Sequence, residues 1–211
     1  MTIDRAGYPF ISGTVAFAIA AALTVGYAGA VPLFVLAAFF TFFFRDPDRV
    51  SPQDPRLVLS PADGRVLVAG PADTEAAPPG GPGWKQVSIF LSPMDVHVNR
   101  SPVSGRVIRV DFRRGKYLPA YHRDAASSNE RSEVWVDHRG FTIVFRQIVG
   151  ILARRVVCRV APGAELQAGQ RFGIMKFGSR MDVFLPASAK LRVAIGDKVV
   201  GGVTVIADLM P

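Results

Sequence analysis

The feature that most restricts how this chain can fold is a long uncharged stretch near its N-terminus. No Asp, Glu, Lys or Arg occurs between Arg5 and Arg45, and most of the 39 intervening residues are Phe, Ala, Val, Ile or Leu. A membrane-spanning helix needs about 20 such residues, so the stretch is long for one helix and short for two. Residues 25–32 (VGYAGAVP) interrupt it with turn-forming Gly and Pro. We therefore expect a hydrophobic helical hairpin over residues 1–49, either as two short spans or as a re-entrant loop.

The flanks of this stretch favour a membrane anchor over a cleaved signal peptide. The apolar region is too long for a signal peptide, and no clear small-residue cleavage site precedes the polar part. Arg45 and Arg49 can lie among lipid head groups, and Asp46-Pro47 ends the helix. A hairpin returns both of its ends to one side, and the chain carries a net charge of +8. We therefore expect peripheral or monotopic attachment to the cytoplasmic side of the cell membrane.

Charge and cysteine content exclude several classes of function. Arg supplies 20 of the 25 basic residues, and its forked guanidinium suits phosphate and carboxylate partners. An anionic membrane surface accounts for this charge, and no basic stripe with interleaved aromatics indicates nucleic-acid binding. The single cysteine, Cys158, excludes an internal disulfide, and its apolar setting predicts a buried small hydrophobe. The three histidines show no ligand spacing, so we expect no metal site.

From residue 50 onward the pattern changes to short alternating runs bounded by Gly, Pro and Asp. Such runs predict strands, and no long helical period accompanies them. Residues 60–68 (SPADGRVLV) and 101–110 (SPVSGRVIRV) form a short internal repeat. Together with the turn GDKVVGG at 196–202, this repeat is typical of lipoyl- and biotinyl-like hairpins. We expect a mainly β domain over residues 50–211, a compact sandwich or barrel with such hairpin repeats. The predicted strands cover residues 65–70, 85–92, 95–100, 105–112, 133–138, 141–150, 154–160, 181–186, 190–195 and 203–209.

Two stretches of this domain lack a strand pattern. Residues 71–83 are rich in Pro, Gly and Ala, a composition that predicts a loop. Residues 116–132 are polar and irregular. A long segment without regular structure inside a compact domain is often functional, so the second stretch is a candidate part of a site.

Three polar residues are candidates for chemistry. Asp63 lies in SPADG, where Asp-Gly by itself indicates a hairpin turn. His97 would share a strand face with Asp95 and Asn99, and a structural hydrogen-bonding role is its ordinary alternative. Ser179, in the segment MKFGSRMDVFLP, has the local pattern of a turn residue. The sequence contains neither a Gly-x-Ser-x-Gly elbow nor a phosphate-binding Gly-rich loop.

The ordered set of motifs resembles the phosphatidylserine decarboxylase family in its short bacterial form. The resemblance covers essentially the whole chain and begins with the apolar N-terminus. The motifs that follow are FFRDPDR, SPADGRV, FLSPMDVHVNRSPVSG, NER, and FGSR followed by DV and LP. Their order behind a hydrophobic anchor is what makes the resemblance specific.

This resemblance implies that the bond between Gly178 and Ser179 cuts itself. The Ser179 hydroxyl would attack the Gly178 carbonyl, and β-elimination, tautomerisation and loss of ammonia would follow. Ser179 would thereby become a covalent pyruvoyl group, the pyruvate cofactor of the enzyme. The products would be a large chain of residues 1–178 and a small chain of residues 179–211, associated as a heterodimer that is compatible with a higher oligomer.

The resemblance also implies decarboxylation of a membrane phospholipid, phosphatidylserine, to phosphatidylethanolamine and CO2. The pyruvoyl group would form a Schiff base with the serine amine of the lipid and accept the electrons left by CO2. His97 is the candidate base and proton donor, because its intrinsic pKa suits proton transfer, and Asp63 would orient it as in a protease triad.

Two departures from the long form of the family affect these assignments. Long-form members carry a His-x-x-His pair where this chain has His97 and Arg100, and Leu-Gly-Ser-Thr where it has Phe-Gly-Ser-Arg. His97 is thus the one candidate histidine in that segment, and its share in self-cleavage, in decarboxylation or in both stays open. Gly178 and Ser179 are retained, so we expect the chemistry to be retained as well.

Other functions fit parts of the sequence. Lipoyl- and biotinyl-type carrier domains modify a lysine in a Met-Lys turn, and Met175-Lys176 supplies one. Ser179 would then be inert, but the residue after Lys176 is neither Met nor Ala, and a carrier does not need a membrane hairpin. The remaining alternatives are a decarboxylase of the same mechanism acting on another serine-headed lipid and a membrane-tethered β-domain without chemistry.

Overall fold

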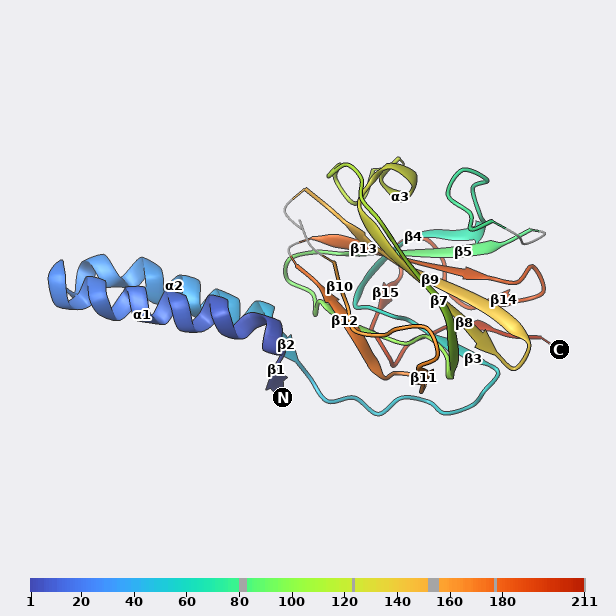
Figure 1. Cartoon of the computed structure of the whole chain (residues 1–211), viewed down its shortest axis with the longest axis horizontal. Helices are drawn as coiled ribbons and strands as arrows, with labels where there is room; N and C mark the ends of the chain where they lie inside the picture. The colour runs from blue at the N-terminus through green and yellow to red at the C-terminus, as the bar shows by residue number, and fades with distance from the viewer. Residues whose placement is uncertain (80–82, 123, 152–155, 177, 211) are drawn as a thin grey trace. The chain divides into compact units, whose positions relative to one another are not determined.

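A computed structural model describes residues 1–79, 83–122, 124–151, 156–176 and 178–210 of the chain (Figure 1). The chain forms two compact units, Met1–Asp48 and Arg49–Pro211. The first is helical and the second is mainly β. The predicted fold class, a β-rich domain preceded by a hydrophobic helical hairpin, is confirmed.

The N-terminal unit is a hairpin of two helices that lie side by side (Figure 1). A 3-10 turn (Arg5–Gly7) leads into α1 (Tyr8–Thr24), and α2 (Tyr27–Phe43) follows after two residues. Gly26 makes the turn with a φ of 91°, a left-handed conformation that glycine adopts without steric cost. The short strands β1 (Thr2–Ile3) and β2 (Arg45–Asp46) pair and hold the two ends of the hairpin together.

The surface of the hairpin is apolar. The helical stretch Arg5–Thr24 is long and apolar enough to cross a membrane, whereas α2 is shorter. Phe17, Leu23 and Phe34 are exposed although they are large and apolar, which suits a lipid environment. Pro32 was expected to help break the apolar stretch but lies inside α2. Its ring fixes a helical φ, and the absence of its N–H removes one hydrogen bond from the helix.

The second unit is built on one curled sheet of eight antiparallel strands in the order β11-β7-β8-β9-β13-β5-β4-β15. Two three-stranded sheets, β10-β12-β6 and β14-β16-β3, complete the unit with the short helix α3 (Ala125–Ser128). The large sheet contains β4 (Gly64–Pro71), β5 (Lys85–Leu91), β7 (Gly105–Arg113), β8 (Arg131–His138), β9 (Phe141–Val149), β11 (Glu165–Leu166), β13 (Ser179–Leu185) and β15 (Lys198–Val199). The small sheets contain β3 (Leu57–Leu59), β6 (Val98–Arg100), β10 (Val156–Cys158), β12 (Arg171–Met175), β14 (Lys190–Leu191) and β16 (Val205–Asp208).

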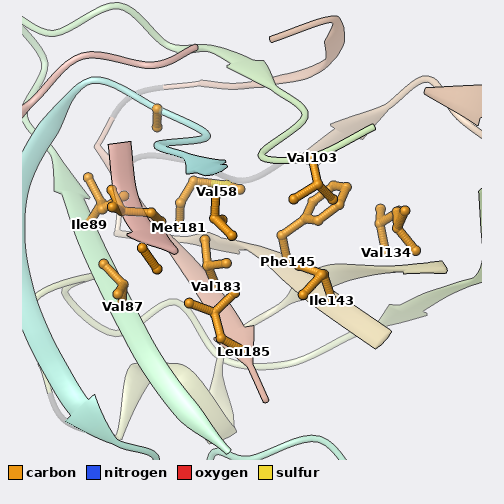
Figure 2. Close-up of a cluster of buried hydrophobic side chains, with 14 of the residues drawn as sticks. Val58, Val87, Ile89, Val103, Val134, Ile143, Phe145, Met181, Val183 and Leu185 are labelled. Carbon is orange, nitrogen blue, oxygen red and sulfur yellow. The ribbon is translucent and has the colours of Figure 1, made fainter. Parts of the chain in front are cut away.

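The core lies on one face of the large sheet, and β13 contributes alternate side chains to it (Figure 2). Met181, Val183 and Leu185 are fully buried there, and Phe145 of β9 and Ile89 of β5 pack in the same cluster. Because successive side chains of a strand point to opposite faces, the intervening residues of β13 lie on the other face of the sheet.

β13 is also paired on both sides. Its register with β5 runs from Ser179 opposite Leu91 to Leu185 opposite Lys85. On the other edge, Ser179 is opposite Val149 of β9. The segment that begins at Ser179 is therefore a central strand of the sheet.

Two expectations from the sequence need correction here. The strand expected over residues 95–100 begins only at Val98, because a turn precedes it. In that turn the Ser92 N–H donates to the Asp95 carboxylate at 2.8 Å, and the Asp95 N–H donates back to the Ser92 carbonyl oxygen at 2.9 Å. The stretch 116–132 is not wholly irregular either, since it contains α3 and the first residues of β8.

The sequence analysis also missed β12, where Gly173 interrupts the apolar alternation. A methyl group on Gly173 would lie 2.4 Å from the carbonyl oxygen of Val157, so glycine is what lets β10 and β12 approach. Cys158, at the end of β10, is half-buried against the core rather than fully buried. Residues 154–155 of the strand expected there lie outside the described residues.

Candidate active site

The Gly-Ser pair lies at the start of β13. Ser179 is the first residue of this strand and is fully buried. Gly178 precedes it with a φ of 73°, in the left-handed region that other residues rarely adopt. The bond between them is thus held at the end of a rigid central strand, and Ser179 itself is not a turn residue. Phe177 lies outside the described residues.

His97 lies beside this bond. Its Nε2 accepts a hydrogen bond from the Gly178 N–H at 3.3 Å, and its Nδ1 is 3.0 Å from the carbonyl oxygen of Asp95. A carbonyl oxygen can only accept, so we assign the ring proton to Nδ1, which leaves a lone pair on Nε2. The fully buried imidazole is therefore a base that can take up a proton next to the Gly178–Ser179 bond.

The Ser179 hydroxyl is buried and has no hydrogen-bond partner among the described residues. Leaving a buried polar group unsatisfied costs about 1–3 kcal/mol, so native proteins seldom do it without a functional reason. Because no neighbour holds this hydroxyl, it can rotate toward the adjacent carbonyl carbon.

The carboxylate of Asp63 binds Arg49 and Gly201. Both oxygens of its carboxylate accept from the Arg49 guanidinium, at 2.6 and 2.9 Å, and Oδ1 also accepts from the Gly201 N–H at 2.8 Å. Its hydrogen bonds to the described residues do not reach His97, whose Nδ1 contacts the Asp95 carbonyl instead. The role of Asp63 in orienting His97 stays a prediction.

Gly150 lies against the carbonyl oxygen of Gly178, and no motif in the sequence indicated this contact. A methyl group on Gly150 would lie 2.5 Å from the carbonyl oxygen of Gly178 and 3.2 Å from the Cβ of Ala120. The segment after β9 therefore passes directly against the oxygen of the Gly-Ser bond. A side chain larger than hydrogen has no room there unless this carbonyl moves.

Asn129 fixes the segment that carries Gly150. Its buried amide nitrogen donates to the carbonyl oxygens of Val149 and Leu118, both at 2.8 Å, and its amide oxygen accepts from the Leu118 N–H at 2.9 Å. Asn129 thus ties the 116–132 stretch to the end of β9. The NER motif was the only sign of this residue in the sequence, and its hydrogen-bonding partners are not apparent there.

Lys176, the residue that a carrier domain would modify, directly follows β12 and is half-buried. A lysine that receives a cofactor must be reached by the modifying enzyme, which partial burial disfavours. In the described part of the chain, no group of three or more His, Cys, Asp or Glu side chains could hold a metal ion.

The ion pair of Arg49 and Asp63 should contribute measurably to the free energy of unfolding. Their side chains are 9% and 16% exposed, so Asp63→Asn leaves a largely buried guanidinium without its carboxylate. We expect Asp63→Asn and Arg49→Gln each to lower the free energy of unfolding by about 3–5 kcal/mol in denaturant titrations. The double variant should lose clearly less than the sum, because both changes remove one interaction. Additive losses would show that the pair is not coupled.

Two comparisons with known proteins give the family. Residues 36–207 match the family model described as phosphatidylserine decarboxylase, and this range includes Asp63, His97, Gly178 and Ser179. The phosphatidylserine decarboxylase proenzyme of Chlorobaculum parvum (strain DSM 263 / NCIMB 8327) is 45% identical over 173 residues, which are 82% of this chain and 79% of that protein. The resemblance in the motifs is thereby confirmed, and the chain belongs to the phosphatidylserine decarboxylase family of enzymes.

Proposed function

We propose that this protein decarboxylates phosphatidylserine to phosphatidylethanolamine at the membrane, using a pyruvoyl group that it makes from its own Ser179. Family membership supports the substrate and the reaction, and the word proenzyme in the name of the relative supports processing. The observation that carries the proposal is the position of His97, whose Nε2 accepts a hydrogen bond from the N–H of Gly178, the residue that supplies the carbonyl of the Gly178–Ser179 bond.

The proposed cleavage uses the residues at this bond. The Ser179 Oγ bonds to the Gly178 carbonyl carbon while its proton passes to His97 Nε2. The C–N bond between residues 178 and 179 then breaks, and its nitrogen takes a proton, which leaves an ester. β-Elimination removes the Cα proton of residue 179 and breaks the bond between Cβ and Oγ, so Gly178 keeps both oxygens as a carboxylate and residue 179 becomes a dehydroalanine. A proton moves to its Cβ to give the imine, water adds to Cα, and ammonia leaves to give the ketone.

The surroundings of residue 179 fit a pyruvoyl group. The Ser179 hydroxyl makes no hydrogen bond to the described residues that its conversion would break. The rest of β13 is held by β5 and β9, so residue 179 keeps its place once Gly178 is detached. When present, the group supplies a carbonyl that accepts the electrons left by CO2. His97, held by the Asp95 carbonyl, is the residue that we expect to deliver the replacing proton.

The sheet explains how two chains would stay associated. The proposed small chain, residues 179–211, contains β13 in the middle of the large sheet. It also contains β15, which pairs with β4, and β16, which pairs with β3. With Met181, Val183 and Leu185 buried in the core, separation of the chains would require unfolding. We therefore propose a heterodimer of the chains 1–178 and 179–211.

We further propose that residues 1–49 anchor the enzyme and that residues 50–211 form the catalytic domain. The exposed apolar side chains of α1 and α2 suit insertion into lipid as a monotopic or peripheral anchor. The positive charge of the chain suits the anionic cytoplasmic surface of the cell membrane. The anchor would keep the active site at the surface where its lipid substrate is found.

The mass of the purified protein tests the proposed processing. We expect two chains, with the smaller one of 33 residues beginning at a pyruvoyl-blocked residue 179. Ser179→Ala should remain one chain and lose all decarboxylation, whereas the control Ser188→Ala, at an exposed position of the same segment, should be cut and active. Active protein with a single uncut chain would refute the proposal, and added mass on Lys176 would support a carrier instead.

Gly150 provides a test of the geometry at the cut. Gly150→Ala places a methyl group against the Gly178 carbonyl oxygen, so the carbonyl must shift. A misplacement of about 1 Å can cost about 10²-fold in rate, and we expect a comparable slowing of the cut on gels of newly made protein. Gly70→Ala is the matched control, because its added methyl group meets no atom within 4 Å. Equal rates for the two variants would contradict the proposed arrangement.

A further inference from the structure

A cavity of about 690 Å³ lies on the face of the large sheet opposite the core. Arg180 of β13 and Gln86 of β5 line it together with Val68, Ala72, Tyr121 and Ala126. We propose that this cavity binds the phosphodiester of the phospholipid substrate, with Arg180 as its cationic contact. The inference rests on the proposed function and adds a binding site for the head group.

Arg180 is buried and held in one orientation. It is 4% exposed, its Nε donates to Asp182 Oδ1 at 2.6 Å, and its Nη2 donates to Asp182 Oδ2 at 3.2 Å and to Ser88 Oγ at 2.9 Å. Gln86 Nε2 also donates to Asp182 and Ser88, both at 3.0 Å, which fixes the carboxylate in turn. The guanidinium is therefore positioned before any ligand arrives, which reduces the cost of binding.

One edge of this guanidinium remains available. Nη1 of Arg180 has no hydrogen-bond partner among the described residues. This nitrogen is also not completely buried, because it is absent from the fully buried polar atoms that lack a partner. Arg180 lines the cavity, and Nη1 is the nitrogen of its guanidinium that these hydrogen bonds leave for a ligand there. A guanidinium donor that is partly shielded from water binds phosphate oxygens through charge-assisted hydrogen bonds.

The cavity is close to the reacting position. Arg180 directly follows Ser179, and consecutive Cα atoms are about 3.8 Å apart. In phosphatidylserine only three bonds separate the serine α-carbon from the phosphorus atom. The two side chains point to opposite faces of the sheet, but the carbon that must react with the lipid amine is the main-chain Cα of residue 179. A lipid bound at that carbon can therefore bring its phosphodiester within reach of residue 180.

The cavity wall is mixed, which indicates an amphiphilic ligand. Val68, Ala72 and Ala126 are apolar, Asp73 and Thr74 add polar groups, and the cavity leaves space beside Arg180 that a bare phosphate ion would not fill. Tyr121, at 65% exposure, lies against Phe90 with ring centroids 6.0 Å apart and extends the apolar surface outward. The chemical class that fits is a phosphodiester attached to a glycerol backbone and acyl chains.

Binding to an unreactive chain tests the proposal without relying on turnover. The full-length Ser179→Ala chain, in detergent, is titrated calorimetrically with dihexanoylphosphatidylserine, with dihexanoylglycerol and with inorganic phosphate. We expect the phospholipid to bind and dihexanoylglycerol to bind at least about tenfold more weakly, because dihexanoylglycerol lacks the charged group that accepts hydrogen bonds from Arg180. Inorganic phosphate that binds as tightly as the phospholipid would overturn the assignment to a lipid.

Two variants locate the site. Ala72→Trp fills the cavity without touching the ion pair of Arg180, and Arg180→Lys keeps the charge but removes the fork. In the Ser179→Ala background each should weaken phospholipid binding about tenfold or more, whereas Ala161→Trp, at an exposed position away from the cavity, should not. Unchanged binding in both variants would overturn the proposal.

In chains that retain Ser179, Ala72→Trp should still be cut and should raise KM more than it lowers kcat. Normal cutting with an unchanged KM would refute this site and leave the proposed decarboxylase intact.

Discussion

The two-sided pairing of β13 is the constraint on which the rest of the active site depends. Backbone partners in β5 and β9 fix Ser179 at the first position of a central strand, and three alternate side chains of β13 anchor it in the core. This pairing holds Gly178 where its N–H donates to His97 and its carbonyl oxygen lies against Gly150. The same pairing would hold a cut chain in place, so one structural feature would serve both the uncut chain and the proposed product.

Because side chains alternate along β13, its two faces carry different kinds of residue. The core face supplies stability through Met181, Val183 and Leu185, and this stability can offset the unsatisfied hydroxyl of Ser179. The opposite face carries the buried pair of Arg180 and Asp182. A strand that is both core element and site gives more precise positioning than a loop, at the cost of burying charged groups that need partners.

The sequence was sufficient for the fold class and the helical hairpin, because hydrophobic runs are local signals, and its ordered motifs were sufficient to propose the Gly-Ser pair as a candidate site. It was not sufficient for contacts that depend on register. Gly150 meets Gly178 only because β9 pairs with β13, and Asp63 meets Gly201 across 138 positions of the chain. The start of β6 at Val98 depends on hydrogen bonds between Ser92 and Asp95, which alternation alone does not reveal. Periodicity indicates which face a residue occupies, but not which strand lies beside it.

The most direct measurement for the account is the rate at which newly synthesised chain is cut when His97 is changed. General base catalysis contributes about 10²–10⁴-fold, so His97→Ala should be cut at least about 100-fold more slowly than the unchanged chain, as judged by the appearance of the 179–211 fragment. Partial restoration by added imidazole would identify the missing group as a base. A His97→Ala chain that is cut at the unchanged rate would contradict the assignment of His97 to this step.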